Sequence, residues 1–118
     1  MLGHLGRTRR GRHVAEPYEL SAEEASGYWA DVSRVARAID AVFTPMKLNL
    51  LTLGNWAPHL HTHVVPRYVD DPAPGNPITY ADMLSEEPIP VERFRAQASA
   101  LWQELRPPDP DGEPDGPR

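Results

Sequence analysis

The stretch His59-Leu60-His61-Thr62-His63-Val64-Val65 dominates the interpretation of this chain. Histidines alternate along it with mostly apolar residues, and a two-residue period is typical of a β-strand with one face toward a core. His59, His61 and His63 would then project from one face, about 7 Å between neighbours along the strand. Leu60, Thr62 and Val64 would face the other way. The pattern therefore predicts a strand that presents three imidazoles on one side and packs on the other.

The residues before this strand indicate its partner. Residues 46–53 form a short, largely apolar run that ends at Gly54-Asn55, so we predict a strand there. Residues 54–58 form the turn, and residues 59–66 form the second strand. The two strands are expected to pair as an antiparallel hairpin.

Two helices are predicted on either side of the hairpin. Ser21 followed by Glu24 is a capping box, and apolar residues then recur at helical period until Pro45, which predicts a helix over residues 21–43. Tyr28 and Trp29 on this helix are expected to pack in the core rather than to stack on a ligand. A second apolar face over residues 91–105, with Pro90 near its start, predicts the other helix.

The rest of the chain divides by composition. Residues 1–12 are rich in Arg and Gly, and we predict an unordered start in which the arginines are solvated. Residues 13–106 are predicted to be the folded domain, within which the proline-rich segment 70–90 is expected to be extended and irregular. Residues 107–118 are acidic and proline-rich, and we predict a disordered tail because they have little to bury.

The overall composition excludes several classes of protein. The 118 residues suffice for one small domain, and without cysteine there is neither a disulfide nor a thiolate metal site. The net charge is −5, and outside the Arg-rich start acids outnumber bases, which argues against a nucleic-acid partner. No apolar run is long enough for a membrane helix. A cytoplasmic protein without a membrane partner is the default expectation.

Three interpretations of the histidine cluster compete on chemistry alone. A neutral imidazole is a good nucleophile near neutral pH, and flanking imidazoles can donate hydrogen bonds to phosphate oxygens, which favours a phosphate site. A metal site is the second, but three alternate positions on a flat strand spread over about 14 Å, too far for one ion. Two of them with a carboxylate from elsewhere remain possible as ligands. The third interpretation is a solvated strand without chemistry.

A resemblance to a known family adds to these observations. Residues 53–67, from Leu53-Gly54-Asn55 through the three histidines to Pro66-Arg67, resemble the signature of the histidine triad (HIT) hydrolases, in the form of bacterial dinucleoside polyphosphate hydrolases. Residues 12–21 resemble the segment that leads into the family's first long helix, so the similarity covers about residues 12–105. It implies an α+β fold, with a HIT-like antiparallel β-sheet and two packing helices. The chain departs from the family by a shortened N-terminus and by Thr62, where an apolar residue is usual.

The resemblance also implies roles for individual residues. His61 matches the nucleophile that attacks the α-phosphorus, with its other ring nitrogen held by a backbone carbonyl. His59 and His63 match the flanking catalytic histidines. Asn55 stands where the family often has a polar side chain beside the phosphates, or else is a plain turn residue after Gly54. Asn49 on the preceding strand is a further candidate for substrate binding, and His13 matches a family histidine near the site. Arg67 is expected to serve solvation of the strand end rather than catalysis. No metal and no cofactor is implied, and the family suggests a homodimer formed through the first helix.

The sequence thus leads to one leading function and two alternatives. We expect a nucleotide hydrolase or transferase that cleaves at the α-phosphate of a dinucleoside polyphosphate or nucleoside phosphoramidate through a covalent nucleotidyl-histidine. The first alternative is a catalytically silent nucleotide-binding protein with an incomplete pocket. The second is a His-rich metal-binding module.

Overall fold

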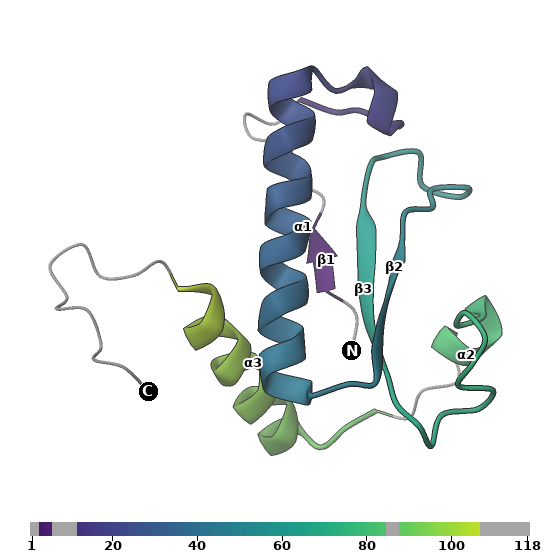
Figure 1. The fold of residues 1–118 in the computed structure, drawn as a ribbon, viewed down its shortest axis with the longest axis vertical. Coiled ribbons are helices and arrows are strands. Elements are labelled where there is room, and N and C mark those ends of the chain that lie inside the picture. The colour runs from purple at the N-terminus through teal and green to yellow at the C-terminus, as the bar shows by residue number, and fades with distance from the viewer. Residues whose placement is uncertain (1–2, 6–11, 85–87, 107–118) are drawn as a thin grey trace, which may run out of the picture.

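Helices and a small antiparallel sheet make up the structure, an α+β arrangement as predicted (Figure 1). This computed structural model describes residues 3–5, 12–84 and 88–106. The elements follow in the order β1 (Gly3–Leu5), a 3₁₀ turn at Pro17–Glu19, α1 (Ala22–Phe43), β2 (Lys47–Leu51), β3 (Thr62–Arg67), α2 (Tyr80–Leu84) and α3 (Val91–Leu105). None of these helices is both long and apolar enough to cross a bilayer.

The sheet has the strand order β1-β3-β2, and both pairings are antiparallel. Leu51 is opposite His63 and Lys47 is opposite Arg67, which confirms the predicted hairpin. Both strands are shorter than the predicted 46–53 and 59–66, so the connection between them covers residues 52–61. His59 and His61 therefore precede β3, and of the three histidines only His63 lies within it.

Helix α1 begins where the capping box predicted. Ser21 Oγ accepts a hydrogen bond from Glu24 N at 3.1 Å, and Ser21 N donates to Glu24 Oε1 at 3.0 Å. These two bonds satisfy amide groups that an uncapped first turn would leave unpaired. The helix ends at Phe43, and Thr44 follows in the left-handed conformation with φ 45°. Pro45 then prevents the helix from continuing, as expected.

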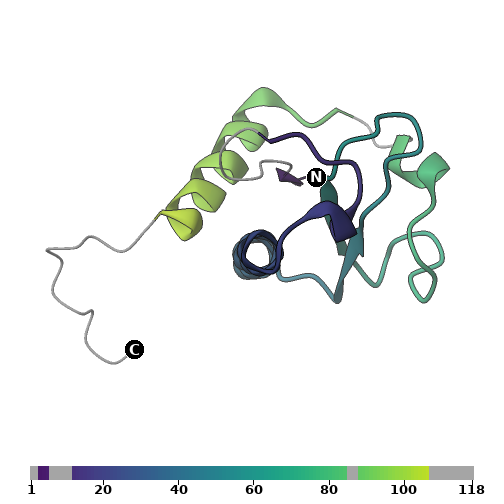
Figure 2. The ribbon, with the colours of Figure 1, turned by 90° about the horizontal axis from the view of Figure 1, so that it is seen from above.

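The hydrophobic core lies between α1 and one face of the sheet. Apolar side chains of both elements, of the segment before α1 and of the connection before β3 are buried together there: Val14, Leu20, Tyr28, Val32, Val35, Ile39, Leu60 and Val64. Helix α3 packs on α1, and its Leu101 and Leu105 extend the core. Seen from above, the sheet stands between α1 and the segment that carries α2 (Figure 2). Because Val64 of β3 is in this core, the neighbouring His63 projects from the opposite face of the sheet, away from α1.

The predictions that residues 1–12 are unordered and that segment 70–90 is irregular are each wrong in part. Gly3–Leu5 pairs with β3 as β1, although residues 1–12 were expected to be unordered. Within segment 70–90, residues 80–84 form α2, where Thr79 Oγ1 accepts from Asp82 N at 3.1 Å. A Thr followed three residues later by an acid is a helix-start signal, and Thr79 and Asp82 carried it in the sequence. The predicted tail at 107–118 lies outside the described residues.

Candidate active site

The three histidines form a continuous row of rings. The ring centroids of His59 and His61 are 4.8 Å apart, and those of His61 and His63 are 4.9 Å apart. The rings are thus closer together than the 7 Å or so between alternate backbone positions of a regular strand, so they lean toward one another. His61, in the middle, is 9 % exposed, whereas His59 and His63 are half-buried. The structure thus brings the three predicted catalytic residues together.

The middle ring is oriented by the main chain. His61 Nδ1 is 2.9 Å from the carbonyl oxygen of His59. A carbonyl oxygen can only accept, so Nδ1 carries the hydrogen and donates it. In the neutral ring, Nε2 then carries the lone pair that a nucleophile needs. This is the backbone contact that the resemblance implied for the residue at this position.

The turn before the histidines explains how that carbonyl is placed. Gly54 has φ +138°, a conformation that side chains other than hydrogen rarely allow. A Cβ on Gly54 would lie 3.4 Å from the oxygen of Ala57 and 3.8 Å from the oxygen of His59. His59 N donates to the same Ala57 oxygen at 2.7 Å, which closes the turn. Glycine is therefore required where the chain folds back on the carbonyl that holds His61.

The opposite face of the triad segment is buried as predicted. Leu60 and Val64 are 4 % and 0 % exposed and belong to the core under α1. Thr62 is 1 % exposed, and its Oγ1 is 2.6 Å from Tyr28 Oη and 2.8 Å from Thr52 Oγ1. A hydroxyl buried at this position is therefore satisfied by two other hydroxyls, which accounts for the departure from an apolar residue.

The aromatic pair on α1 only partly follows expectation. Tyr28 is 7 % exposed and belongs to the core, as predicted. Burial raises the pKa of the Tyr28 phenol above 10.0, and the hydrogen bond with Thr62 opposes this shift. Trp29 is 42 % exposed and meets Tyr28 edge to face, with ring centroids 5.1 Å apart. Its assignment to the core was wrong, because neighbouring residues on a helix point about 100° apart and α1 directs Tyr28 rather than Trp29 into the core.

A fourth histidine joins the row from a distant part of the sequence. The ring of His13 lies 6.5 Å from that of His59, centroid to centroid. A backbone hydrogen bond holds the segment of His13 beside the histidine row, since Leu60 N donates to Val14 O at 2.7 Å. Residues 13–15 run beside the triad segment without being part of the sheet.

The segment around His13 is tied to the start of α1. Arg12 Nη1 contacts Glu24 Oε1 at 2.7 Å, and Arg12 Nη2 donates to Glu19 O at 2.7 Å, so this arginine is not merely solvated as expected. Glu19 Oε2 accepts from the amides of Ala15 and Glu16. The amides of Glu16 and Ala15 lower the pKa of Glu19, and the amide of Ser21 lowers that of Glu24.

The two candidate asparagines lie in different environments. Asn55 is exposed in the connection between β2 and β3. Asn49 pairs with Val65 in β2, and its Oδ1 accepts from Arg67 Nη1 at 2.8 Å and from Ile78 N at 3.2 Å. Its oxygen is thus committed to contacts within the protein.

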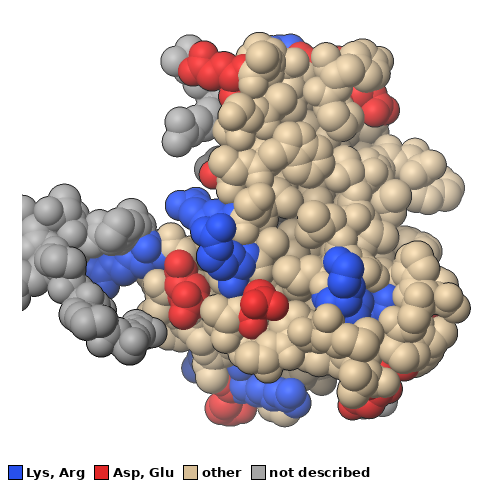
Figure 3. Space-filling model, viewed as in Figure 1, with Lys and Arg blue, Asp and Glu red and all other residues tan. Residues whose placement is uncertain are grey.

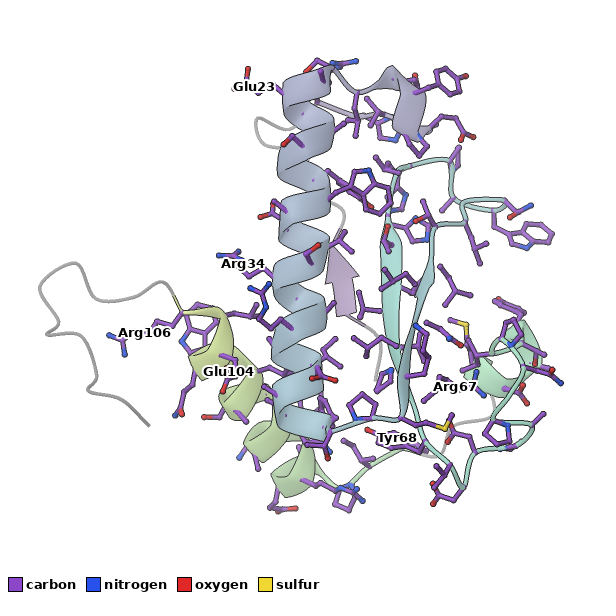
Figure 4. All side chains as sticks on the ribbon, in the orientation of Figure 1. Glu23, Arg34, Arg67, Tyr68, Glu104 and Arg106 are labelled. Atoms are coloured by element: carbon purple, nitrogen blue, oxygen red, sulfur yellow. The ribbon has the colours of Figure 1, made fainter. Side chains whose placement is uncertain are left out.

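Arg67 does not serve solvation of the strand end. It is 3 % exposed, and its guanidinium donates to Asn49 Oδ1, to Asp71 Oδ2 at 3.0 Å and to Asn76 O at 2.9 Å. The expectation was wrong because these partners come from β2 and from the chain after β3, which the sequence alone does not bring together. Figure 4 labels Arg67 near α2, and Arg34 on the far side of α1.

The distribution of charge on the surface and the possible metal ligands bear on the alternative functions. On the surface seen in Figure 3, Lys and Arg side chains gather in the lower half, and the upper half between the start of α1 and the β2–β3 connection is mostly uncharged. Within the described ranges, no three His, Cys, Asp or Glu side chains are placed to hold one metal ion. The metal-binding alternative therefore has no such ligand set in this part of the chain.

Comparisons with known proteins agree with this geometry. The HIT domain family matches residues 8–70. A curated protein of Bacillus subtilis, Protein hit, is 38 % identical over 61 residues, which are 48 % of this chain and 42 % of that protein. The chain thus matches less than half the length of this relative.

Solved structures are similar over most of the chain. A histidine triad protein from Sinorhizobium meliloti is 26 % identical with a TM-score of 0.73, over 86 % of this chain and 73 % of that one. A histidine triad protein from Marinobacter aquaeolei is 27 % identical with a TM-score of 0.66, over 88 % of each chain. HIT proteins are generally nucleotide-binding hydrolases or transferases. On its sequence, its fold and its row of histidines, the chain belongs to the HIT domain family.

Proposed function

We propose that the chain is a nucleotide hydrolase or transferase in which His61 attacks the α-phosphorus of a dinucleoside polyphosphate or nucleoside phosphoramidate. The observation that carries the proposal is the hydrogen bond from His61 Nδ1 to His59 O, because it leaves the lone pair of the neutral ring on Nε2. The rings of His59 and His63 lie on either side of His61, where they can donate to the oxygens of a bound phosphate.

The proposed reaction has two steps. In the first, the Nε2 lone pair forms a P–N bond while the bond from phosphorus to the leaving group breaks, and the leaving group keeps the electron pair and takes up a proton from solvent. In the second, water attacks the same phosphorus, the P–N bond breaks, its electron pair returns to Nε2, and the proton of the water passes to solvent. Covalent catalysis divides one difficult displacement into two easier ones, and the work of the protein is positioning and charge stabilisation.

The residues around the triad have supporting parts in the proposal. His13 extends the row beyond His59, and we propose that it contacts a substrate group farther from the α-phosphate. Asn55 is exposed in the connection before the triad, where it can reach a bound nucleotide. For Asn49 we propose a supporting role, through the contacts that hold β2 to Arg67. The proposed step uses no metal ion and no cofactor.

A second copy of the chain is part of the proposal. Family resemblance suggests pairing through α1, and the half-exposed Trp29 offers apolar surface there. We place the protein in the cytoplasm and assign it no nucleic-acid or membrane partner. Analytical ultracentrifugation should give twice the chain mass, and Trp29→Asp should return the monomer mass. A monomer for the unmodified chain would contradict this part.

The central test is the intact mass of the protein after brief exposure to an adenylate-donating substrate and an acid quench. We expect an adenylyl adduct on the unmodified chain and none on His61→Ala. Arg93→Met is the control, since this exposed residue of α3 lies outside the histidine row and the variant should retain the adduct. Nucleotide binding by calorimetry without adduct or turnover would instead support the catalytically silent alternative.

A further inference from the structure

Three hydroxyl groups form a chain behind the histidine row. Thr62 Oγ1 is 2.6 Å from Tyr28 Oη and 2.8 Å from Thr52 Oγ1. The three residues come from α1, β3 and the connection after β2, so the chain joins the helix to both sides of the hairpin. Thr62 sits at its centre and is 1 % exposed. This hydroxyl chain is not needed to fill space, because a valine of nearly the same shape would do so.

The hydrogens in the chain have a preferred order. Thr62 has one hydroxyl hydrogen, so it donates to one neighbour and accepts from the other. A phenol is the stronger donor and the weaker acceptor of the two kinds of hydroxyl. Either oxygen of each pair can be the donor, and the acidity of the phenol favours the order in which Tyr28 donates to Thr62 and Thr62 donates to Thr52. Each bond is directional, so the Thr62 side chain is held from two sides at once.

The position of Thr62 links this chain to the site. Its backbone joins His61 to His63, and its side chain projects to the face opposite theirs. Holding Oγ1 from the helix and from the connection therefore fixes the rotation of the segment about its own axis. That rotation sets the direction in which the imidazoles on the other face project.

We propose that Thr62, held by Tyr28 and Thr52, is a positioning residue that fixes the aim of His61 at the reacting phosphorus. This inference rests on the proposed function and adds to it a set of hydrogen-bonded hydroxyl groups on the side of the strand away from the substrate. It acts through His61 and does not touch the substrate. A displacement of a reacting group by about 1 Å can lower a rate about 100-fold, so small rotations are sufficient.

The decisive variant is Thr62→Val, which keeps the shape and removes the hydroxyl. We expect kcat to fall between about 10-fold and about 100-fold with KM nearly unchanged, because binding survives while the aim is lost. Thr62→Ser keeps the hydroxyl and should retain most of kcat. Thr52→Val breaks the chain at its more exposed end and should lower kcat in the same direction if Thr62→Val folds poorly.

The matched control is Ile39→Val, which weakens the same core near the C-terminal end of α1 and leaves the three hydroxyl groups in place. It should lower stability and leave kcat unchanged. Equal losses of kcat in Ile39→Val and Thr62→Val would overturn the proposal, because a general loosening of the core would then explain both. An unchanged kcat in Thr62→Val and Thr52→Val would overturn it as well.

A spectroscopic measurement separates this inference from the proposed function. Nitrogen NMR of the imidazoles reports which ring nitrogen of His61 carries the hydrogen, with or without turnover. We expect one Nδ1–H tautomer in the unmodified chain and a mixture in Thr62→Val. If the chain has no activity, a tautomer mixture in Thr62→Val still supports the positioning role, and an unaltered spectrum contradicts it.

Discussion

Arg67 Nη1 donates to Asn49 Oδ1 over 2.8 Å, and this bond joins the two hairpin strands at the end remote from His63. The same guanidinium holds Asp71 and the carbonyl of Asn76 in the chain after β3. The buried arginine thereby fastens the segment that leads to α2 onto the histidine-bearing face of the sheet.

Replacing Arg67 should cost more than a surface arginine does. We expect Arg67→Met to lower the free energy of unfolding by about 3 kcal/mol, because it leaves Asn49 and the chain after β3 without their shared donor. Arg93→Met, on the exposed side of α3, should change it by less than about 0.5 kcal/mol. Urea unfolding of both variants gives the comparison, and equal values would show that the Arg67 contacts add nothing.

Thr44 offers a substitution that should stabilise the protein. It ends α1 in the left-handed region, at φ 45° and ψ 53°, where a β-branched residue is strained. Asparagine adopts this conformation more readily, so Thr44→Asn should raise the free energy of unfolding by about 1 kcal/mol. Thermal unfolding would measure the gain, and Thr79→Asn, at a position without positive φ, serves as the comparison. A lower melting temperature for Thr44→Asn would refute the strain argument.

Acid should loosen the junction between residues 12–20 and α1. The folded-state pKa values of Glu19 and Glu24 lie below the ordinary 4.5, because backbone amides donate to both carboxylates. A lowered folded pKa stabilises the fold above the unfolded value and loses that contribution as the pH falls through the folded one. Stability should therefore decline as the pH drops below about 4.5, and the decline should be smaller in Glu24→Gln. The dependence of urea midpoints on pH measures it, and identical slopes would count against this assignment.

Gly54 connects the geometry of the turn to activity. Alanine at φ +138° is strained, although its Cβ would meet the oxygens of Ala57 and His59 only at ordinary contact distances. We expect Gly54→Ala to lower turnover at least 10-fold by moving the carbonyl that holds His61. Gly75→Ala, whose Cβ would meet nothing within 4 Å, should have no effect on turnover. The ratio of the two rates decides the point, and similar rates would show that the turn tolerates a side chain.

Local signals predicted the helices and the hairpin well. The capping box at Ser21 and Glu24, Pro45 after α1 and the apolar face of residues 91–105 each act over a few residues, and the structure places both helices within one residue of the predicted bounds. The burial of Leu60 and Val64 also followed from alternation alone. These features depend on neighbours in the chain, which the sequence displays directly.

Features that depend on distant partners were not predictable in the same way. Arg67 is buried because Asn49, Asp71 and Asn76 converge on it, and Thr62 is buried because Tyr28 and Thr52 meet it. The pairing of Gly3–Leu5 with β3 and the approach of His13 to His59 are also long-range. The strand β3 begins later than alternation suggested, since Leu60 N bonds to Val14 O rather than to the hairpin partner.

The late start of β3 has a consequence for how the site opens. His63 is held by the sheet, but His59 and His61 belong to the connection, whose amides do not share in the β2–β3 ladder. A fluctuation that separates Leu60 N from Val14 O would release two members of the triad while the hairpin stays paired. The amide of Leu60 should then exchange its hydrogen with solvent faster than that of Val64. The row of histidines would assemble and come apart in a local equilibrium of its own, with a free energy smaller than that of unfolding the protein.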